Sequence, residues 1–175
     1  MTAAFENAFL ELMSIPGPSL IKRDTRPTNA SVDAEGQVRW FDWEHACRRW
    51  IADDLIWLLC DETLPDLALG QRILLEQVAR PRPEAPCPEP ASAYLSVAVQ
   101  HHIAWRVGLH LQDLRDGGDR TLSDCIANDW TGSVEAVRHL CAAGAAWATL
   151  EPHTVPLADW YRSIAGSTLP VGPTE

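Results

Sequence analysis

The 175-residue chain is predicted to adopt an α+β fold that is mainly α, with one small β-hairpin. Two observations predict this class. Segments with apolar residues at helical spacing make up most of the chain, whereas short strand-like runs are confined to residues 19–41. We expect one domain over residues 1–165, because this length is sufficient for one hydrophobic core. A flexible tail is expected over residues 166–175, which contain glycine, serine and two prolines.

The expected helices are separated by glycine and proline. Their ranges are residues 3–13, 49–60, 66–79, 91–115, 132–150 and 156–165. Gly117 and Gly118 end the helix over 91–115. The apolar side of that helix is predicted to comprise Tyr94, Ala98, Trp105 and Leu109. Five prolines within residues 81–90 predict an extended loop. Gly144 would allow a neighbouring helix to approach closely.

The strand-like runs predict a hairpin that follows a loop. The expected strands are Ser19–Ile21, Ala30–Asp33 and Val38–Phe41. Gly36 supplies the turn between the second and third strands, since glycine reaches positive φ easily. Pro27 stiffens the loop that follows the first strand. The hairpin therefore places Asp42 beside the loop that carries Asp24 and Asn29.

Three polar residues of this region have the spacing of a phosphoryl-transfer site. Asn29 follows Asp24 by five positions, and Asp42 follows Asn29 by thirteen. In a kinase-type site, one Asp accepts the proton of the attacking hydroxyl, and an Asn and a second Asp hold the magnesium ions that bridge the phosphates. Oxygen-bearing side chains suit this role because Mg²⁺ is a hard cation. The spacing predicts Asp24 as the catalytic base, with Asn29 and Asp42 as magnesium and nucleotide ligands.

The same residues resemble the aminoglycoside phosphotransferase family, which is related to choline kinases and more distantly to protein kinases. Its members carry His-Gly-Asp-x-x-x-x-Asn, then two strands and Ile-Asp-Trp-Glu; here Asp42, Trp43 and Glu44 occupy the second motif. Residues 51–55 are similar to the family's Pro-Ala-x-Asp-Leu-Ala segment. The resemblance implies that Asp54 anchors the catalytic loop through backbone N–H groups. It covers about residues 15–60.

The chain departs from the family pattern at two loop positions and in the length of the segment that precedes the loop. Lys22 stands where the family has a histidine that supports the loop, and Arg23 stands where it has glycine. Only about twenty residues precede Asp24, too few for a nucleotide-binding lobe. The resemblance therefore implies the helical C-terminal lobe of a protein-kinase-like fold without its N-terminal lobe. Glu44 has two possible roles. It either contacts the metal or the substrate, or it is a solvated charge at the end of a strand.

The resemblance implies ATP- and magnesium-dependent phosphorylation of a hydroxyl on a small molecule, in a chain that is truncated or needs a second chain. ATP is expected to bind this chain alone weakly or not at all. The alternative is a non-catalytic remnant or protein-interaction module. Apolar side chains near Asp24 and Asp42 should be exposed on the face left by the missing lobe, where the chain would self-associate or bind a partner protein.

Composition excludes several other classes of function. A formal charge of −10 argues against nucleic acid as a partner, and it would suit a cationic acceptor such as an aminoglycoside. No run approaches the roughly 18 apolar residues of a membrane span, and the N-terminus does not read as a signal peptide. We therefore expect a cytoplasmic protein without a membrane partner.

The cysteine, histidine and tryptophan residues are expected to have structural roles only. The five cysteines form no Cys-x-x-Cys pair, so neither a disulfide framework nor a zinc site is expected. His101 and His102 are adjacent on a helix and point in different directions, and together with His110 they do not predict a metal site. The eight tryptophans are expected to pack mainly in the core.

Overall fold

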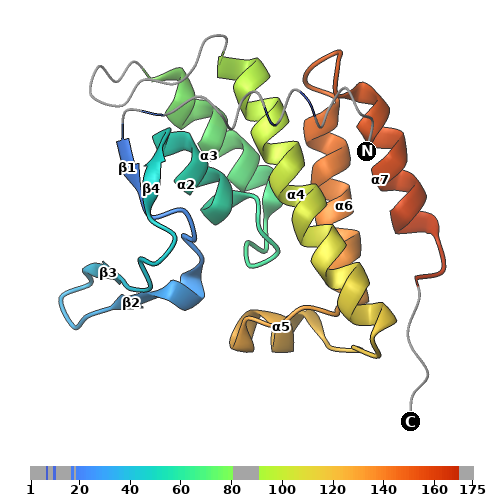
Figure 1. The fold of residues 1–175 in the computed structure, drawn as a ribbon, viewed down its shortest axis with the longest axis horizontal. Helices are drawn as coiled ribbons and strands as arrows, with labels where there is room; N and C mark the ends of the chain where they lie inside the picture. Colours follow the sequence, from blue (N-terminus) through green and yellow to red (C-terminus); the bar gives the residue numbers. More distant parts are fainter. Residues whose placement is uncertain (1–6, 8–9, 11–16, 18, 81–90, 170–175) are drawn as a thin grey trace.

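The protein's structure, a computed structural model, describes residues 7, 10, 17, 19–80 and 91–169. Two small antiparallel sheets lie at one end of an array of helices (Figure 1). The strands are β1 (Ser19–Ile21), β2 (Ala30–Val32), β3 (Val38–Trp40) and β4 (Cys47–Arg49), and a 3-10 turn, η1 (Pro27–Asn29), precedes β2. The described helices are α2 (Ile51–Leu59), α3 (Leu67–Ala79), α4 (Ala91–Arg115), α5 (Leu122–Asn128), α6 (Val134–Ala148) and α7 (Val155–Gly166). This arrangement confirms an α+β fold that is mainly α.

The start of α2 corrects one prediction. A helix was expected from residue 49, but Cys47–Arg49 form β4 and the helix begins at Ile51. β4 pairs antiparallel with β1, so that Ser19 lies opposite Arg49. A Cys-Arg-Arg run has no apolar alternation that would mark it as a strand, and only the distant pairing defines it. This pairing brings the chain that leaves the hairpin back to the loop after β1.

The remaining helices agree with their predicted positions, with one addition. The bounds of α4 match the expected range, and those of α3, α6 and α7 lie within two residues of theirs. The short helix α5 was not expected. The Thr121 side chain caps it by accepting a hydrogen bond from the Asp124 backbone N–H. The expected loop over 81–90, and all of the expected helix over 3–13 except residues 7 and 10, lie outside the described residues.

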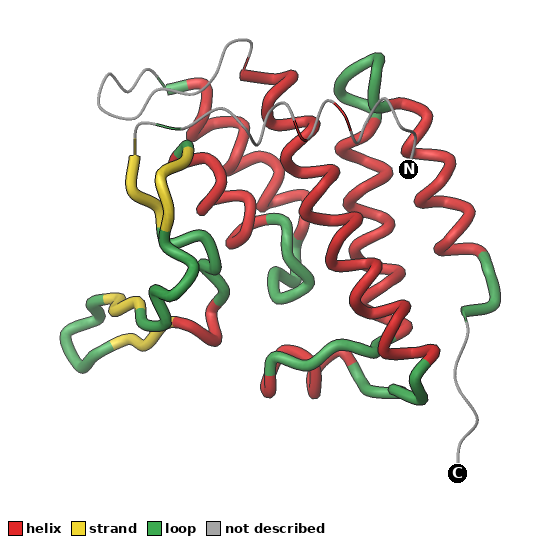
Figure 2. Tube along the Cα trace, in the orientation of Figure 1, coloured by secondary structure: helices red, strands yellow, loops and turns green. Residues whose placement is uncertain are grey.

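The predicted hairpin is present. β2 and β3 pair antiparallel with Val32 opposite Val38, and Gly36 in the turn has φ +78°. Viewed by element type, the strands occupy one side of the molecule and helices the remainder (Figure 2). The apolar runs and Gly36 were enough to predict this hairpin because the turn and both strands are adjacent in the chain.

The core lies among the helices and is centred on α4. Helix α6 packs against both α4 and α7, and α2 packs against α3 and α4. Gly144 of α6 allows the close approach that was expected, because a Cβ atom there would lie 2.5 Å from the Tyr161 ring of α7. Leu169 is also buried in this core, and residues 170–175 lie outside the described residues.

Two predictions about aromatic residues need correction. Trp105 was placed on the buried side of α4, yet 40% of its surface is exposed. Trp43 and Trp130 are also exposed, whereas Trp147 is buried as expected. α4 buries several polar side chains in place of a simple apolar stripe, namely Ser96, Gln100, His102, Arg106 and His110. None of the described helices combines the length and apolar character needed to cross a membrane.

Candidate functional site

The loop after β1 is anchored to α2 by Asp54. The Asp54 carboxylate accepts hydrogen bonds from the backbone N–H groups of Lys22, at 3.0 Å, and Arg23, at 2.6 Å. The Asp54 backbone carbonyl accepts a further bond from the Thr25 hydroxyl at 2.6 Å. The anchoring role that the resemblance implied for Asp54 is therefore present. Arg23 has φ 75°, a left-handed conformation that glycine adopts more easily, so the anchor holds a strained residue in place.

Lys22 joins the loop to the hairpin. Its side chain is buried, and the Nζ group donates to the backbone carbonyls of Asp24 and of Asp42, the latter at 3.0 Å. Asp42 itself has φ 58°, so the backbone is left-handed at the point where the lysine contacts it. A buried ammonium needs such partners because its charge has left water. Lys22 thus supports the loop where the resemblance expected a histidine.

Asp24 is buried and held by two neighbours. The Arg26 guanidinium donates to Oδ1 at 2.8 Å and to Oδ2 at 3.2 Å, and the Asn29 amide donates to Oδ2 at 2.7 Å. Burial acts to raise the pKa of Asp24, but hydrogen bonding and charge from Arg26, with Lys22 and Asn29, outweigh it and lower this pKa. Asp24 is therefore a carboxylate near neutral pH. Because an ionised carboxylate has about four acceptor positions, one remains on Oδ1.

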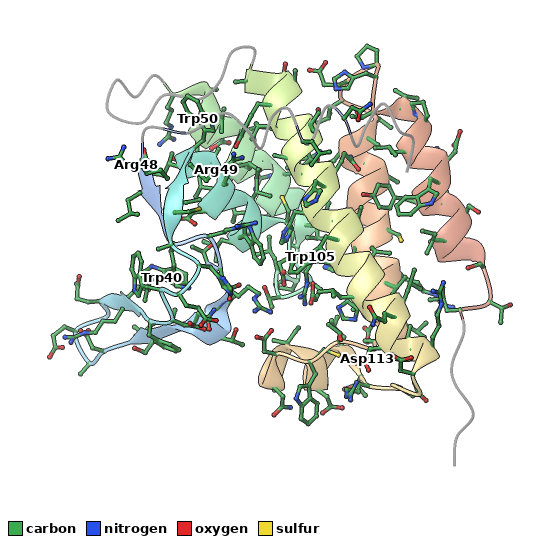
Figure 3. The ribbon with its side chains drawn as sticks, viewed as in Figure 1. Trp40, Arg48, Arg49, Trp50, Trp105 and Asp113 are labelled. Carbon is green, nitrogen blue, oxygen red and sulfur yellow. The ribbon has the colours of Figure 1, made fainter. Side chains whose placement is uncertain are left out.

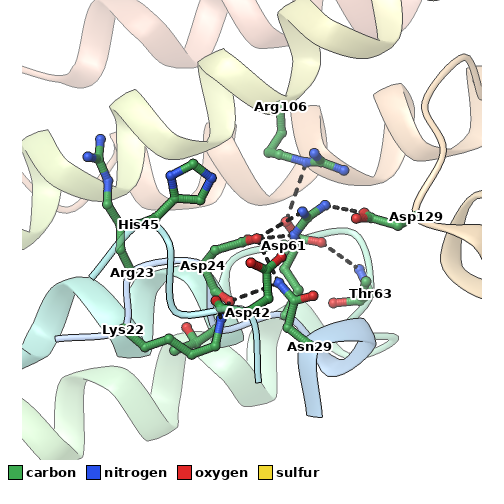
Figure 4. A network of polar contacts seen from close by, with 12 residues as sticks. Lys22, Arg23, Asp24, Asn29, Asp42, His45, Asp61, Thr63, Arg106 and Asp129 are labelled. Carbon is green, nitrogen blue, oxygen red and sulfur yellow. Dashed lines mark hydrogen bonds and ion pairs between the residues drawn. The ribbon is translucent and has the colours of Figure 1, made fainter. Parts of the chain in front are cut away.

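The three predicted site residues occupy one region. Asn29 contacts Asp24 directly, and Lys22 links the backbones of Asp24 and Asp42. Figure 4 labels Asp42 together with Asp24 and Asn29 in one network of polar contacts. Because the Asn29 nitrogen donates to Asp24, its amide oxygen is left for another partner. The fold thus brings together residues that lie on separate segments of the loop and hairpin.

The donor set suits magnesium better than a transition metal. No group of three or more His, Cys, Asp or Glu side chains among the described residues is arranged to hold a metal ion. Magnesium differs from zinc in needing few protein ligands, since it usually keeps several waters and binds one or two carboxylates together with substrate phosphates. The Asp42 carboxylate and the Asn29 amide oxygen fit that requirement.

Arg26 connects the loop to α5. Its guanidinium also forms an ion pair with Asp129, which follows α5 in a left-handed conformation with φ 56°. Asp129 lies 103 positions from Arg26, and nothing local in the sequence pointed to it. Arg26 was not predicted as a site residue either. An arginine two positions after the predicted base was the signal that could have drawn attention to the pair.

A buried ionic network lies next to the site and was also not predicted. Glu62 accepts hydrogen bonds from the Arg106 guanidinium and lies 3.1 Å from His110 Nε2. His110 Nδ1 accepts the Ser133 backbone N–H, so Nε2 carries the proton and donates to Glu62. Burial acts to raise the pKa of Glu62, but the bonds to His110 and Arg106 lower this pKa well below its ordinary value. The network fixes α4 to the segment after α2.

A cavity of about 420 Å³ opens beside Asp24. Its lining includes Asp24 and Arg23 from the loop, Arg49 from β4, and Trp57, His101 and Trp105 from α2 and α4. Figure 3 labels Arg49 and Trp105 on their elements. Glu44 lies outside this lining, is 70% exposed and is 3.4 Å from His45. Its position favours the interpretation of Glu44 as a solvated charge.

Comparison of the chain with models of protein families, with curated proteins and with solved structures finds no significant match. The geometry of the site is therefore the evidence from which a function can be proposed.

Proposed function

We propose that the protein is a phosphotransferase with the helical lobe of a kinase-like fold, which transfers phosphate from ATP to a hydroxyl on a small molecule. The observation that carries the proposal is the loop around Asp24. A carboxylate at the edge of a cavity is joined by the Asn29 amide five residues later, and Asp42 enters the same region from the hairpin. The Asp54 anchor, which the resemblance implied independently of that spacing, supports it as well.

Each residue has a defined task in this reaction. Bound magnesium would neutralise charge on the phosphates, with Asn29 and Asp42 as its protein ligands. Asp24 orients the acceptor hydroxyl through its remaining Oδ1 position and receives the hydroxyl proton. The lowered pKa of Asp24 makes it a weak base, which is compatible with phosphoryl transfer because catalysis there comes mostly from positioning and electrostatics. Arg26 lies against the base and supplies a positive charge beside the transferred group.

Nucleotide affinity should be low in this chain alone. The described residues offer contacts from one side only, so little of the cost of ordering the nucleotide is offset. We expect a dissociation constant for Mg-ATP on the order of 1 mM or weaker. This affinity would rise if a second chain covered the opposite side of the phosphates.

Isothermal titration calorimetry with ATP, with and without magnesium, tests the proposal together with an assay of ADP release. Asp42→Asn keeps the side-chain shape and tolerates the left-handed backbone, and it should abolish the magnesium-dependent part of the binding. Asp159→Asn is the matched control, because Asp159 is 84% exposed on α7. Magnesium-dependent binding that Asp42→Asn leaves unchanged would refute the proposed ligand set. Submicromolar affinity in the isolated chain would refute the one-sided site.

The second candidate function is a non-catalytic interaction module. Two observations favour it. Arg26 already pairs with the carboxylate proposed as the base, and the apolar side chains of Leu20, Phe41 and Trp43 are exposed near the loop and hairpin, as expected for an uncovered face. Under this interpretation the site holds the fold together and the exposed face binds a partner. Phosphate transfer to any hydroxyl, lost in Asp24→Asn, would exclude it.

A further inference from the structure

We propose that the cavity beside Asp24 binds a planar aromatic hydroxyl compound that carries an anionic group, not a cationic amino sugar. The inference rests on the proposed function, because it names the acceptor class of the same site. It depends on which charges in the cavity are already paired, on the aromatic wall, and on one buried histidine.

Both carboxylates in the cavity lining are occupied by cations of the protein. Asp24 is paired with Arg26. Asp53 accepts a hydrogen bond from the Tyr94 hydroxyl and an ion-pair contact of 2.9 Å from Arg49. A cationic ligand would have to compete with these internal partners for either carboxylate. The cavity therefore has no free negative charge to attract an ammonium group.

Arg23 is the cation that remains at this cavity. It is exposed at the cavity lining, and its guanidinium has no hydrogen bond or ion pair within the described part of the chain. Burial, His102 and the charge of Arg23 together lower the pKa of His101 to about 4, so His101 is neutral at neutral pH. Arg23 and His101 both line the cavity, so the Arg23 charge lies at the cavity wall. An anionic group on the ligand would be attracted to it.

Aromatic rings form one wall of the cavity. The ring centroids of Trp57 and Trp105 are 5.2 Å apart, and the His102 ring lies 4.8 Å from Trp57. Trp105 is 40% exposed and lines the cavity, so part of its ring surface is available to a ligand. A planar ring stacked on Trp105 would bury it. The cavity volume of about 420 Å³ accommodates a two-ring compound with substituents.

His102 supplies an unused polar contact. It is buried and lines the cavity, yet neither ring nitrogen has a hydrogen-bond partner among the described residues. The nearest carboxylate oxygen, Asp61 Oδ2, is 3.6 Å from Nε2 and also lacks a hydrogen bond there. Buried polar groups without partners are uncommon in folded proteins. A polar substituent on a bound ligand would satisfy this histidine.

The formal charge of −10 points to the opposite ligand class, and the local arrangement explains the difference. Long-range charge affects the approach of a ligand and is screened over about 10 Å at moderate salt. Selection inside a cavity depends on the charges that contact the ligand. Here those are Arg23 and two pairs that are already neutralised.

Calorimetric titration without nucleotide tests the inference with three matched probes. They are a hydroxymethyl naphthoate, the corresponding naphthamide and the corresponding naphthylmethylamine, which share one ring system and carry negative, zero and positive charge. The naphthoate should bind about tenfold more tightly than the naphthamide, which corresponds to about 1.4 kcal/mol, and the amine should bind most weakly. Arg23→Gln should remove the preference for the acid, and Trp105→Leu should weaken all three probes.

Arg162→Gln is the matched control, since Arg162 lies on α7 and pairs with Asp159. It should leave all three affinities unchanged. Equal or tighter binding of the amine, a preference for the acid that survives Arg23→Gln, or no binding of any probe would overturn the inference. The outcome is separable from that of the proposed function. Preferred binding of the acid without ADP release would support the ligand class alone, and ADP release with a cationic acceptor would support the function alone.

Discussion

Asp54→Ala should destabilise the protein by about 2–4 kcal/mol, because it removes the anchor of the loop. The carboxylate accepts the backbone N–H of Lys22, which is buried, and that of Arg23, which is exposed. Leaving a buried N–H unsatisfied costs about 1–3 kcal/mol, and the exposed bond contributes about 1 kcal/mol more. Release of Arg23 from its left-handed backbone lowers the loss somewhat.

Asp54→Asn should cost less, on the order of 1 kcal/mol. Burial raises the pKa of Asp54 more than the two backbone hydrogen bonds lower it. The folded state therefore disfavours the charged form of this carboxyl group. Asparagine keeps one acceptor oxygen and removes that penalty. Urea denaturation followed by tryptophan fluorescence measures both variants, with Asp159→Ala on the exposed side of α7 as the control. A change below about 0.5 kcal/mol in Asp54→Ala would refute the anchoring role.

Three further predictions concern pH, packing and association. Glu62 has a lowered pKa in the folded state, so its contribution is present above its ordinary value of 4.5 and is lost as pH falls through the lower folded value. Glu62→Gln should therefore cost about 3 kcal/mol at neutral pH, and urea melts should show the deficit shrinking in acid. Gly144→Ala should destabilise the protein by about 1–3 kcal/mol in the same assay, because the added methyl group overpacks against α7. Gly108→Ala is the control: a Cβ atom there has no neighbour within 4 Å among the described residues, so the substitution should be neutral or stabilising. Light scattering should show concentration-dependent association of the protein, which Phe41→Ser should reduce. Val155→Ser, at a similarly exposed residue, is the control and should leave the association unchanged. A monomer at all concentrations would refute the prediction of self-association.

The sequence predicted those parts of the fold that depend on local patterns. The β2–β3 hairpin follows from two short apolar runs around Gly36, and α4 follows from its length and from the glycines after it. β4 was missed because it is defined by its pairing with β1, roughly thirty positions earlier, and not by a local pattern. α5 was missed because seven residues carry too little periodicity to be recognised.

The candidate site divides in the same way. Asp24, Asn29 and Asp42 were predicted as site residues from their spacing, since loop and hairpin are contiguous in the chain. The residues that pair with them and set the local charge were not predicted. Asp129 approaches Arg26 from the end of α5, 103 positions along the chain, and the Glu62 network joins residues 44 and 48 positions apart. The sequence pattern predicts which groups would carry the proposed chemistry, whereas packing decides which charges remain available to a ligand.

The distribution of anchors around the loop explains why binding should depend on a covering surface. Asp54 and the Lys22 ammonium fix the loop backbone to α2 and to the hairpin. Arg26 fixes the loop to Asp129, the residue after α5. Phe41 and Trp43, at the end of the hairpin, are exposed. The geometry of Asp24 and Asn29 is therefore set before any ligand arrives. In the proposed phosphotransferase, closing the site around phosphates requires a surface that the described residues do not provide. A partner that covered Phe41 and Trp43 would gain apolar burial and complete the proposed nucleotide site.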